Sequence, residues 1–442
     1  MDAPPSYNKA TANDINFEFC NNDQNVTYVD FAPTCTKPSG IFSSAEYQPF
    51  SELTIAANKW LNEHCNFFVE GCETIGATPL QTRNIGEVNT QETRYHIQIR
   101  RRQGGSKQNN SRIAAINVIK CLRLYVRPKG SNESPEPHQI GYLNISPQLI
   151  SPTGIFRLAK YDSYDNTLKE FNLFLDKNPI PGKILNIEAV TIFRDDNNIA
   201  ADGSLLTETS HYYTSLSTML RVFYLSGPPS YEKIGSADFQ PSIVKPGGLL
   251  SRHQFETLSE TMCKVNTWLS SQMEIRVTNI QTLKINYHKA LKPTITERID
   301  YVLSRHSLQQ FFNIVRVFYT TAPNSGICRP INLSCKIFIP AVLVTKMIGL
   351  DVYETLDNLY SREILPFIRY NSHAKPINIE TLPLNPQENP EAMCSSRSVE
   401  HAPLMIATVR IYFDGVINEP PSNVMQPRPI PVHEGISCCS IL

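Results

Sequence analysis

The chain has 442 residues, which is too long for one hydrophobic core and suits several domains of about one hundred residues each. Its 41 basic and 41 acidic residues cancel, and this balance argues against a general nucleic-acid binder, which would carry an excess of Lys and Arg. No run approaches the roughly twenty apolar residues that span a bilayer, and no basic-then-apolar leader opens the chain, so we expect a soluble body in the cytosol.

One strand pattern recurs four times: an arginine between aliphatic residues, followed two residues later by an aromatic residue. The arginines are Arg123, Arg221, Arg316 and Arg410, and their separations of 98, 95 and 94 residues indicate an internal repeat. A short apolar strand that ends in proline opens each copy, at Pro33, Pro147, Pro241 and Pro340. We therefore predict four tandem modules, at residues 25–128, 138–226, 232–322 and 331–415, between a disordered tail over 1–24 and a proline-containing tail over 416–442.

Module two, residues 138–226, shows the predicted order of elements most clearly. A strand over 140–145 precedes a turn, and apolar residues then recur at helical spacing. These residues are Tyr161, Tyr164, Leu168, Phe171, Phe174 and Leu175. Pro179 ends the helix, and two strands follow at 184–193 and 212–225. The pattern predicts an α+β fold in which each module runs strand, helix, strand, strand, with the helix across one face of a small antiparallel sheet. In module four the helix pattern, around 353–364, slips out of register.

Alternation along neighbouring strands places each arginine on the same face as a residue of the middle strand. The predicted structural cross-strand pairs are Glu73 with Arg123, Glu188 with Arg221, Gln281 with Arg316, and Glu380 with Arg410. Ion pairs that brace the sheet are the plainer interpretation, because architecture repeats with a module more readily than chemistry does. A repeated ligand site is the alternative. We expect the modules to cover one another on this face.

Pro-Pro-Ser-Tyr occurs twice, at Pro4–Tyr7 and at Pro228–Tyr231. The pattern resembles the PPxY ligands of WW domains, in which a polyproline II segment docks on aromatic grooves and the tyrosine fills a pocket. This resemblance implies that WW-domain proteins, such as Nedd4-like ubiquitin ligases, are partners, and that two copies gain avidity toward tandem WW domains. The implied ligand residues are Pro4, Pro5, Tyr7, Pro228, Pro229 and Tyr231. For the second copy, a plain hairpin connection between modules is the alternative.

The sequence ends in Cys439-Ser440-Ile441-Leu442, which resembles a CaaX prenylation box. The resemblance implies a lipid on Cys439, and Leu442 implies geranylgeranyl rather than farnesyl. One lipid chain holds a membrane only marginally, so Cys438 is a candidate for palmitoylation as the second signal. A buried or disulfide-bonded terminal cysteine pair is the alternative.

The sequence shows no motif of a known class of catalytic or cofactor site. It lacks a phosphate-binding Gly-rich loop, Gly-x-Ser-x-Gly, His-Glu-x-x-His and a dinucleotide fingerprint. Its 10 histidines are dispersed, and its 11 cysteines contain no Cys-x-x-Cys, which favours reduced thiols in the cytosol. We therefore expect no catalytic residues, no metal and no cofactor.

Together these features predict a eukaryotic, prenylated scaffold on the cytoplasmic face of a membrane that recruits WW-domain proteins. Two alternatives stay open. One is a self-assembling matrix-like or coat-like protein, and the other is an enzyme or ligand carrier whose site lies between modules.

Overall fold

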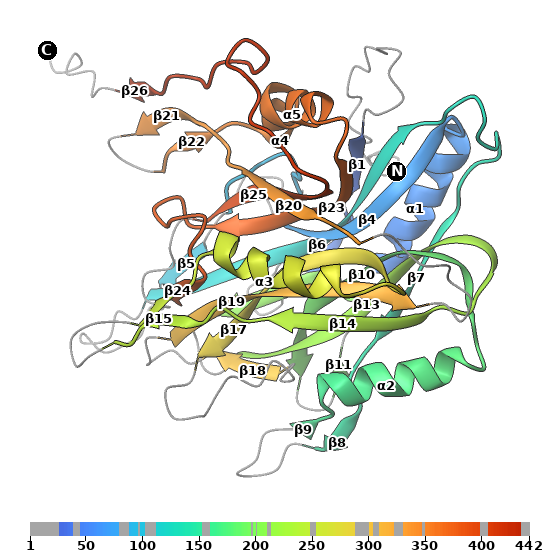
Figure 1. The fold of residues 1–442 in the computed structure, drawn as a ribbon. Helices are drawn as coiled ribbons and strands as arrows, with labels where there is room; N and C mark the ends of the chain where they lie inside the picture. Colours follow the sequence, from blue (N-terminus) through green and yellow to red (C-terminus); the bar gives the residue numbers. More distant parts are fainter. Residues whose placement is uncertain are drawn as a thin grey trace, which may run out of the picture.

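The structure is a computed structural model that describes residues 26–38, 45–78, 88–95, 98–101, 112–152, 160–195, 198–199, 201–209, 214–247, 253–287, 300–303, 309–321, 330–346, 350–397 and 405–434. These residues form a strand-rich fold of several small antiparallel sheets with helices packed over them (Figure 1). This confirms the expected mixture of helices with antiparallel sheets. Within the described ranges, the helices are all too short or too polar to cross a bilayer.

Most helices and strands of the fold are short, and the longest strands have 16 or 17 residues. The helices are α1 Phe50–Glu63, α2 Tyr164–Leu175, α3 Leu258–Ser270, α4 Leu356–Leu359, the π-helical turn η1 Tyr360–Ile364, and α5 Leu365–Tyr370. The strands are β1 Thr27–Phe31, β2 Cys35–Lys37, β3 Glu46–Tyr47, β4 Phe67–Ala77, β5 Gln98–Arg101, β6 Arg112–Pro128, β7 Ile140–Ile145, β8 Leu149–Ser151, β9 Lys160–Tyr161, β10 Ile180–Asp195, β11 Asn198–Ile199, β12 Leu205–Thr209, β13 Thr214–Ser230, β14 Lys233–Phe239, β15 Ile243–Lys245, β16 Gln254–Phe255, β17 Arg276–Tyr287, β18 Asp300–Leu303, β19 Gln309–Thr321, β20 Leu333–Phe338, β21 Val342–Lys346, β22 Val352–Tyr353, β23 Lys375–Leu384, β24 Cys394–Arg397, β25 Ile406–Asp414 and β26 Val432–Glu434.

Each strand that carries one of the four arginines lies between two antiparallel partners. β6 lies between β1 and β4, and β13 lies between β7 and β10. In the same way β19 lies between β14 and β17, and β25 lies between β20 and β23. The opening strand of each predicted module therefore reaches the sheet from one side of the arginine strand, and the middle strand reaches it from the other.

The predicted order of strand, helix, strand, strand leaves out two kinds of element. A hairpin of very short strands precedes each helix: β2–β3, β8–β9, β15–β16 and β21–β22. A further strand follows the middle strand and pairs with a neighbouring sheet: β12 with β6, β18 with β13, and β24 with β19. Sequence patterns miss strands of two to five residues because so few positions cannot show a clear alternation.

Three of the helices begin after a hydroxyl residue that caps them. Ser163, Thr257 and Thr355 precede α2, α3 and α4, and each side chain accepts a hydrogen bond from a backbone N–H in the first turn. α1 follows Pro49, which has no capping side chain. Asp202, from the loop before β12, accepts the first backbone N–H groups instead: its carbonyl accepts that of Phe50 at 2.9 Å, and its carboxylate accepts that of Ser51 at 3.4 Å.

Two details of the predicted helices are wrong. Phe174, one of the apolar positions that predict the helix, is not part of the buried side of α2: it is 51% exposed, and Thr167 is buried. The last helix was placed around 353–364, but it extends to Tyr370 as α4, η1 and α5. The π-helical turn η1 inserts an extra residue, which moves the apolar positions and explains why the pattern slipped out of register.

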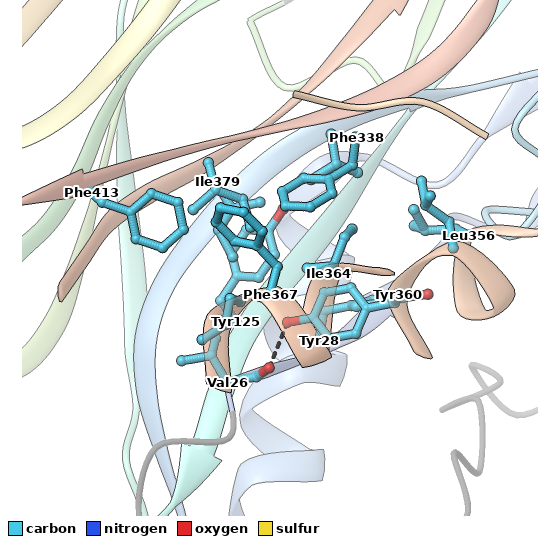
Figure 2. Packing of buried hydrophobic residues seen from close by; sticks show 14 of the residues in the cluster. Val26, Tyr28, Tyr125, Phe338, Leu356, Tyr360, Ile364, Phe367, Ile379 and Phe413 are labelled. Atoms are coloured by element: carbon cyan, nitrogen blue, oxygen red, sulfur yellow. Dashed lines mark hydrogen bonds between the residues drawn. The ribbon is translucent and has the colours of Figure 1, made fainter. Parts of the chain in front are cut away.

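Each helix packs on its own sheet and on the opening strand of the next sheet along the chain. Asn58 of α1 bonds both backbone groups of Ile140 in β7, Asn172 of α2 does the same to Ile234, and Asn266 of α3 does the same to Leu333. The helical segments α4, η1 and α5 complete the series by packing against β1 and the residue before it. Figure 2 shows this cluster, in which the Tyr360 hydroxyl donates to the carbonyl of Val26 at 2.5 Å. The beginning and the end of the described chain therefore share one core.

Candidate functional site

The four repeated arginines lie in the interior. Arg123, Arg221, Arg316 and Arg410 are at most 5% exposed. The strand register places Glu73, Glu188, Gln281 and Glu380 directly opposite them, in the order predicted from alternation. Neighbouring elements cover this face: the guanidinium of Arg221 lies 3.6 Å from the ring centroid of Phe50 in α1, and that of Arg316 lies 3.9 Å from that of Tyr164 in α2.

The ion pairs of these arginines differ from those expected. Arg123 donates to both carboxylate oxygens of Asp30 at 2.7 Å and 2.7 Å, and Arg316 donates to both oxygens of Asp238 at 2.6 Å and 2.6 Å. Both acids belong to the opening strand rather than the middle strand. The same position holds Asn144 opposite Arg221 and Ile337 opposite Arg410. Arg123 thus takes its two-pronged ion pair from Asp30 on the opening strand, while Glu73 stands opposite it on the middle strand as predicted.

The acids of the middle strands bind a second middle strand instead. Glu188 in β10 accepts the backbone N–H of Thr74 in β4 at 3.0 Å, and Glu380 in β23 accepts that of Thr282 in β17 at 2.6 Å. Glu73 in β4 likewise accepts that of Thr381 in β23 at 2.5 Å.

The opposing arginine completes each of these three contacts by donating to the threonine hydroxyl. The distances are 2.9 Å from Arg221 to Thr74, 2.5 Å from Arg410 to Thr282, and 3.1 Å from Arg123 to Thr381. In each case, an acid and an arginine that stand opposite each other in one sheet both bind one threonine of a neighbouring sheet.

The fourth contact uses an amide. Gln281 in β17 accepts the N–H of Ala189 in β10 at 2.8 Å and donates to its carbonyl at 3.1 Å. Ala189 stands where the other three middle strands have threonine, so no hydroxyl is present, and the amide donor satisfies the backbone carbonyl instead. The departure from Glu to Gln therefore has a local reason.

The four contacts form a closed cycle. β10 binds β4, β17 binds β10, β23 binds β17, and β4 binds β23. In three of the four contacts, an asparagine two residues before the Glu or Gln adds a hydrogen bond to a backbone carbonyl. Asn186 donates to Cys72, Asn279 donates to Ile187, and Asn378 donates to Ile280. β4 has Gly71 at that position. The contact between β4 and β23, which joins the first and last of the four arginine-containing sheets, is the one without this bond.

Burial changes the acid–base properties of this cycle. Loss of solvation raises the pKa of Glu188 and of Glu380 to about 7, although Arg221 and Arg410 and the bound N–H groups favour the ionised form. The pKa of Glu73 is also raised by burial. Lys120, next to Cys121 on β6, has its pKa lowered to about 7 by burial and then by the charge of Arg221.

These groups are engaged in holding strands together. Each acid of the cycle accepts bonds from a backbone N–H, and the described residues include no group of three or more His, Cys, Asp or Glu that could hold a metal ion. Asp30 and Asp238 were missed from the sequence, although a signal exists: each stands three residues before the proline that ends the opening strand.

No protein-family model, curated protein or solved structure matches this chain.

The second Pro-Pro-Ser-Tyr segment lies on the surface. Pro228 and Pro229 are exposed near the end of β13, and Tyr231 follows with 63% of its side chain exposed. β14, which comes next, pairs with β19 and not with β13, so the segment is not a hairpin connection. It is held on both sides: Ser230 pairs with Ile180, and Glu232 accepts bonds from Arg276 and Thr320.

The other predicted ligand and lipid residues lie outside the described residues. These are Pro4, Pro5, Tyr7, Cys438 and Cys439.

A groove of about 430 Å³ lies between α2 and β14, beyond Tyr231 along the chain. Its charged residues are Asp165, Lys169, Asp176 and Lys233. Lys233 donates to the Asp176 carboxylate and to the Asn172 carbonyl. The lysine is thereby committed to joining the end of α2 to β14.

Proposed function

We propose that the four predicted modules are copies of one unit that close into a ring within a single chain. The cycle of contacts through β4, β10, β17 and β23 supports this proposal, and so does the packing of each helix on the following opening strand. The repeated polar residues serve this closure, which makes the ring a rigid body rather than a set of active sites.

On this body we propose a scaffold function: the ring presents Pro228–Tyr231 to WW-domain proteins. The observation that carries the proposal is the exposure of Pro228, Pro229 and Tyr231 on a backbone that is fixed at both ends. Proline restricts the backbone dihedral φ, so the segment loses little conformational entropy when it docks in an aromatic groove. A second motif at Pro4–Tyr7 would add avidity toward a tandem WW protein such as a Nedd4-like ubiquitin ligase.

We further propose that geranylgeranyl on Cys439, with palmitoyl on Cys438, anchors this scaffold at the cytoplasmic face of a membrane. Two lipid signals are what stable anchoring requires. The tests of the two halves are independent of each other.

The WW half is tested by binding the full-length chain to a tandem WW fragment of a Nedd4-like ligase. Replacing Tyr231 removes the side chain that fills the pocket, so Tyr231→Ala should weaken binding about tenfold or more, as loss of a central aromatic anchor does. Tyr370→Ala is the matched control, since this tyrosine is 42% exposed on α5 and lies outside any motif. Tyr7→Ala measures the first copy separately. Equal binding by wild type and by the double variant Tyr7→Ala, Tyr231→Ala would refute the proposal.

The membrane half is tested by fractionating cells that express wild type or Cys439→Ser. The variant should move to the soluble fraction, and lipid mass spectrometry of the terminal peptide should find geranylgeranyl only on the wild type. Equal membrane partition of the two proteins would exclude this anchor.

A further inference from the structure

The end of the described chain forms a small sheet with the hairpin of the last module. β26 pairs in parallel with β21, which also pairs with β22 (Figure 1). The register places Val352, Val344 and Val432 in one row across the three strands. Residues directly opposite one another point to the same face of a sheet, so this face carries a row of three valines.

The two outer valines of this row are open to solvent, and Val344 between them is half-buried. Val432 is 64% exposed, and Ile430, two residues before it, is 89% exposed. Leu350, two residues before Val352, is 50% exposed. We call the three valines, together with the exposed Leu350 and Ile430 that precede β22 and β26 in the chain, the valine face; its residues are Val344, Val352, Val432, Leu350 and Ile430. Exposed apolar residues that gather in one place are typical of an interaction surface.

The chain length beyond β26 selects the partner. Glu434 is the last described residue, and Cys439 follows it by five residues. Five residues span at most about 18 Å when fully extended. A lipid on Cys439 that is inserted in a bilayer therefore holds β26 within that distance of the membrane surface.

The described residues near the valine face carry no excess of basic side chains. Lys346 stands opposite Glu434 in the register, and Arg428 donates to the carbonyl of Ile339. An adsorption driven by anionic lipid needs several unpaired Lys or Arg residues. The contact expected here is with the apolar part of the interface and does not depend on anionic lipid.

We propose that the valine face lies against the bilayer surface and acts as an additional anchor beside the lipid. This inference rests on the proposed lipid anchor and adds the orientation of the ring on the membrane: the β21–β22–β26 sheet faces the bilayer. One lipid chain is marginal by itself, and apolar side chains that enter the interface slow its release.

The experiment measures binding of the full-length, geranylgeranylated protein to phosphatidylcholine vesicles, with a parallel set that also contains phosphatidylserine. Val432→Glu and Ile430→Glu should each weaken binding about fivefold to tenfold, because a charged group replaces an apolar one in the interface. Val244→Glu is the matched control: Val244 is 62% exposed on β15, in a different hairpin, and this variant should bind as the wild type does. Mass spectrometry confirms equal lipidation, and circular dichroism confirms equal folding.

The outcomes separate this inference from the proposed anchor. If lipidated Val432→Glu and Ile430→Glu bind as the wild type does, or if Val244→Glu loses as much, the valine face is not the membrane contact. A strong dependence on phosphatidylserine would likewise overturn it. If the Cys439→Ser protein binds vesicles as tightly as the lipidated wild type, the lipid anchor fails instead. A second measurement uses Val432→Trp, whose added fluorescence should be quenched by bromine-labelled phosphatidylcholine and would remain unquenched if the face points away.

Discussion

Removing the carboxylate of Asp30 should destabilise the protein strongly. Arg123 and Asp30 form a two-pronged ion pair with N–O distances of 2.7 Å and 2.7 Å, and each side chain is only 2% exposed. Asp30→Ala would leave the guanidinium buried without its counter-ion, and such a loss typically costs 3–5 kcal/mol, or about 4 kcal/mol here. The other contacts of Arg123, to the Thr381 hydroxyl and over the Tyr28 ring, cannot replace a charge.

Urea unfolding followed by circular dichroism measures this loss as a lower transition midpoint at an unchanged slope. The control is Glu46→Ala, which breaks a surface pair with Lys37 whose side chains are 62% and 55% exposed. Water screens that pair, so its loss should cost less than about 1 kcal/mol. The double variant Asp30→Leu, Arg123→Met should recover part of the stability, because it removes both charges of the buried Asp30–Arg123 pair. A loss for Asp30→Ala no larger than that for Glu46→Ala would refute the reasoning.

Other buried contacts are expected to respond to substitution as follows. Glu188 has a folded pKa of about 7 against an ordinary value of 4.5, so its ionisation removes stability as the pH rises between these values. Glu188→Gln should abolish that loss, so its free energy of unfolding should exceed that of the wild type by up to roughly 3 kcal/mol at pH 8. At pH 5 the two free energies should differ far less. A difference that is independent of pH would contradict this. Thr381→Val removes the hydroxyl held by Glu73 and Arg123 and should cost about 1–3 kcal/mol in urea unfolding, whereas no cost would mean that the contact between β4 and β23 does not hold the ring. At Gly141 an added Cβ would lie 2.2 Å from the side-chain ring of Tyr224, so Gly141→Ala should cost about 1–3 kcal/mol of stability. The control Gly227→Ala, with nothing within 4 Å of its Cβ, should cost less. Equal melting temperatures of the two variants would show that the tyrosine side chain moves aside freely.

Local alternation made the cross-strand neighbours predictable. Glu188 and Arg221 are opposite each other because period-two alternation and antiparallel pairing are properties of two adjacent strands. The acid that pairs with Arg123 was harder to find, since Asp30 lies more than ninety residues earlier and its register depends on which edge of β6 the opening strand joins. The π-helical turn at 360–364 was not predictable from spacing, because an inserted residue looks like a loss of helical pattern.

The sequence by itself determined the four arginine strands and their antiparallel partners, whereas the exposure of Pro228–Tyr231 came from the structure. These follow from patterns within a few residues, which any chain displays before it folds. Only the tertiary structure decided that Glu73 binds Thr381 and that Tyr360 packs against β1. The reason is physical: similar strands offer similar edges and faces to several neighbours, so the choice among them depends on how all the helices and sheets pack together, and not on any one segment.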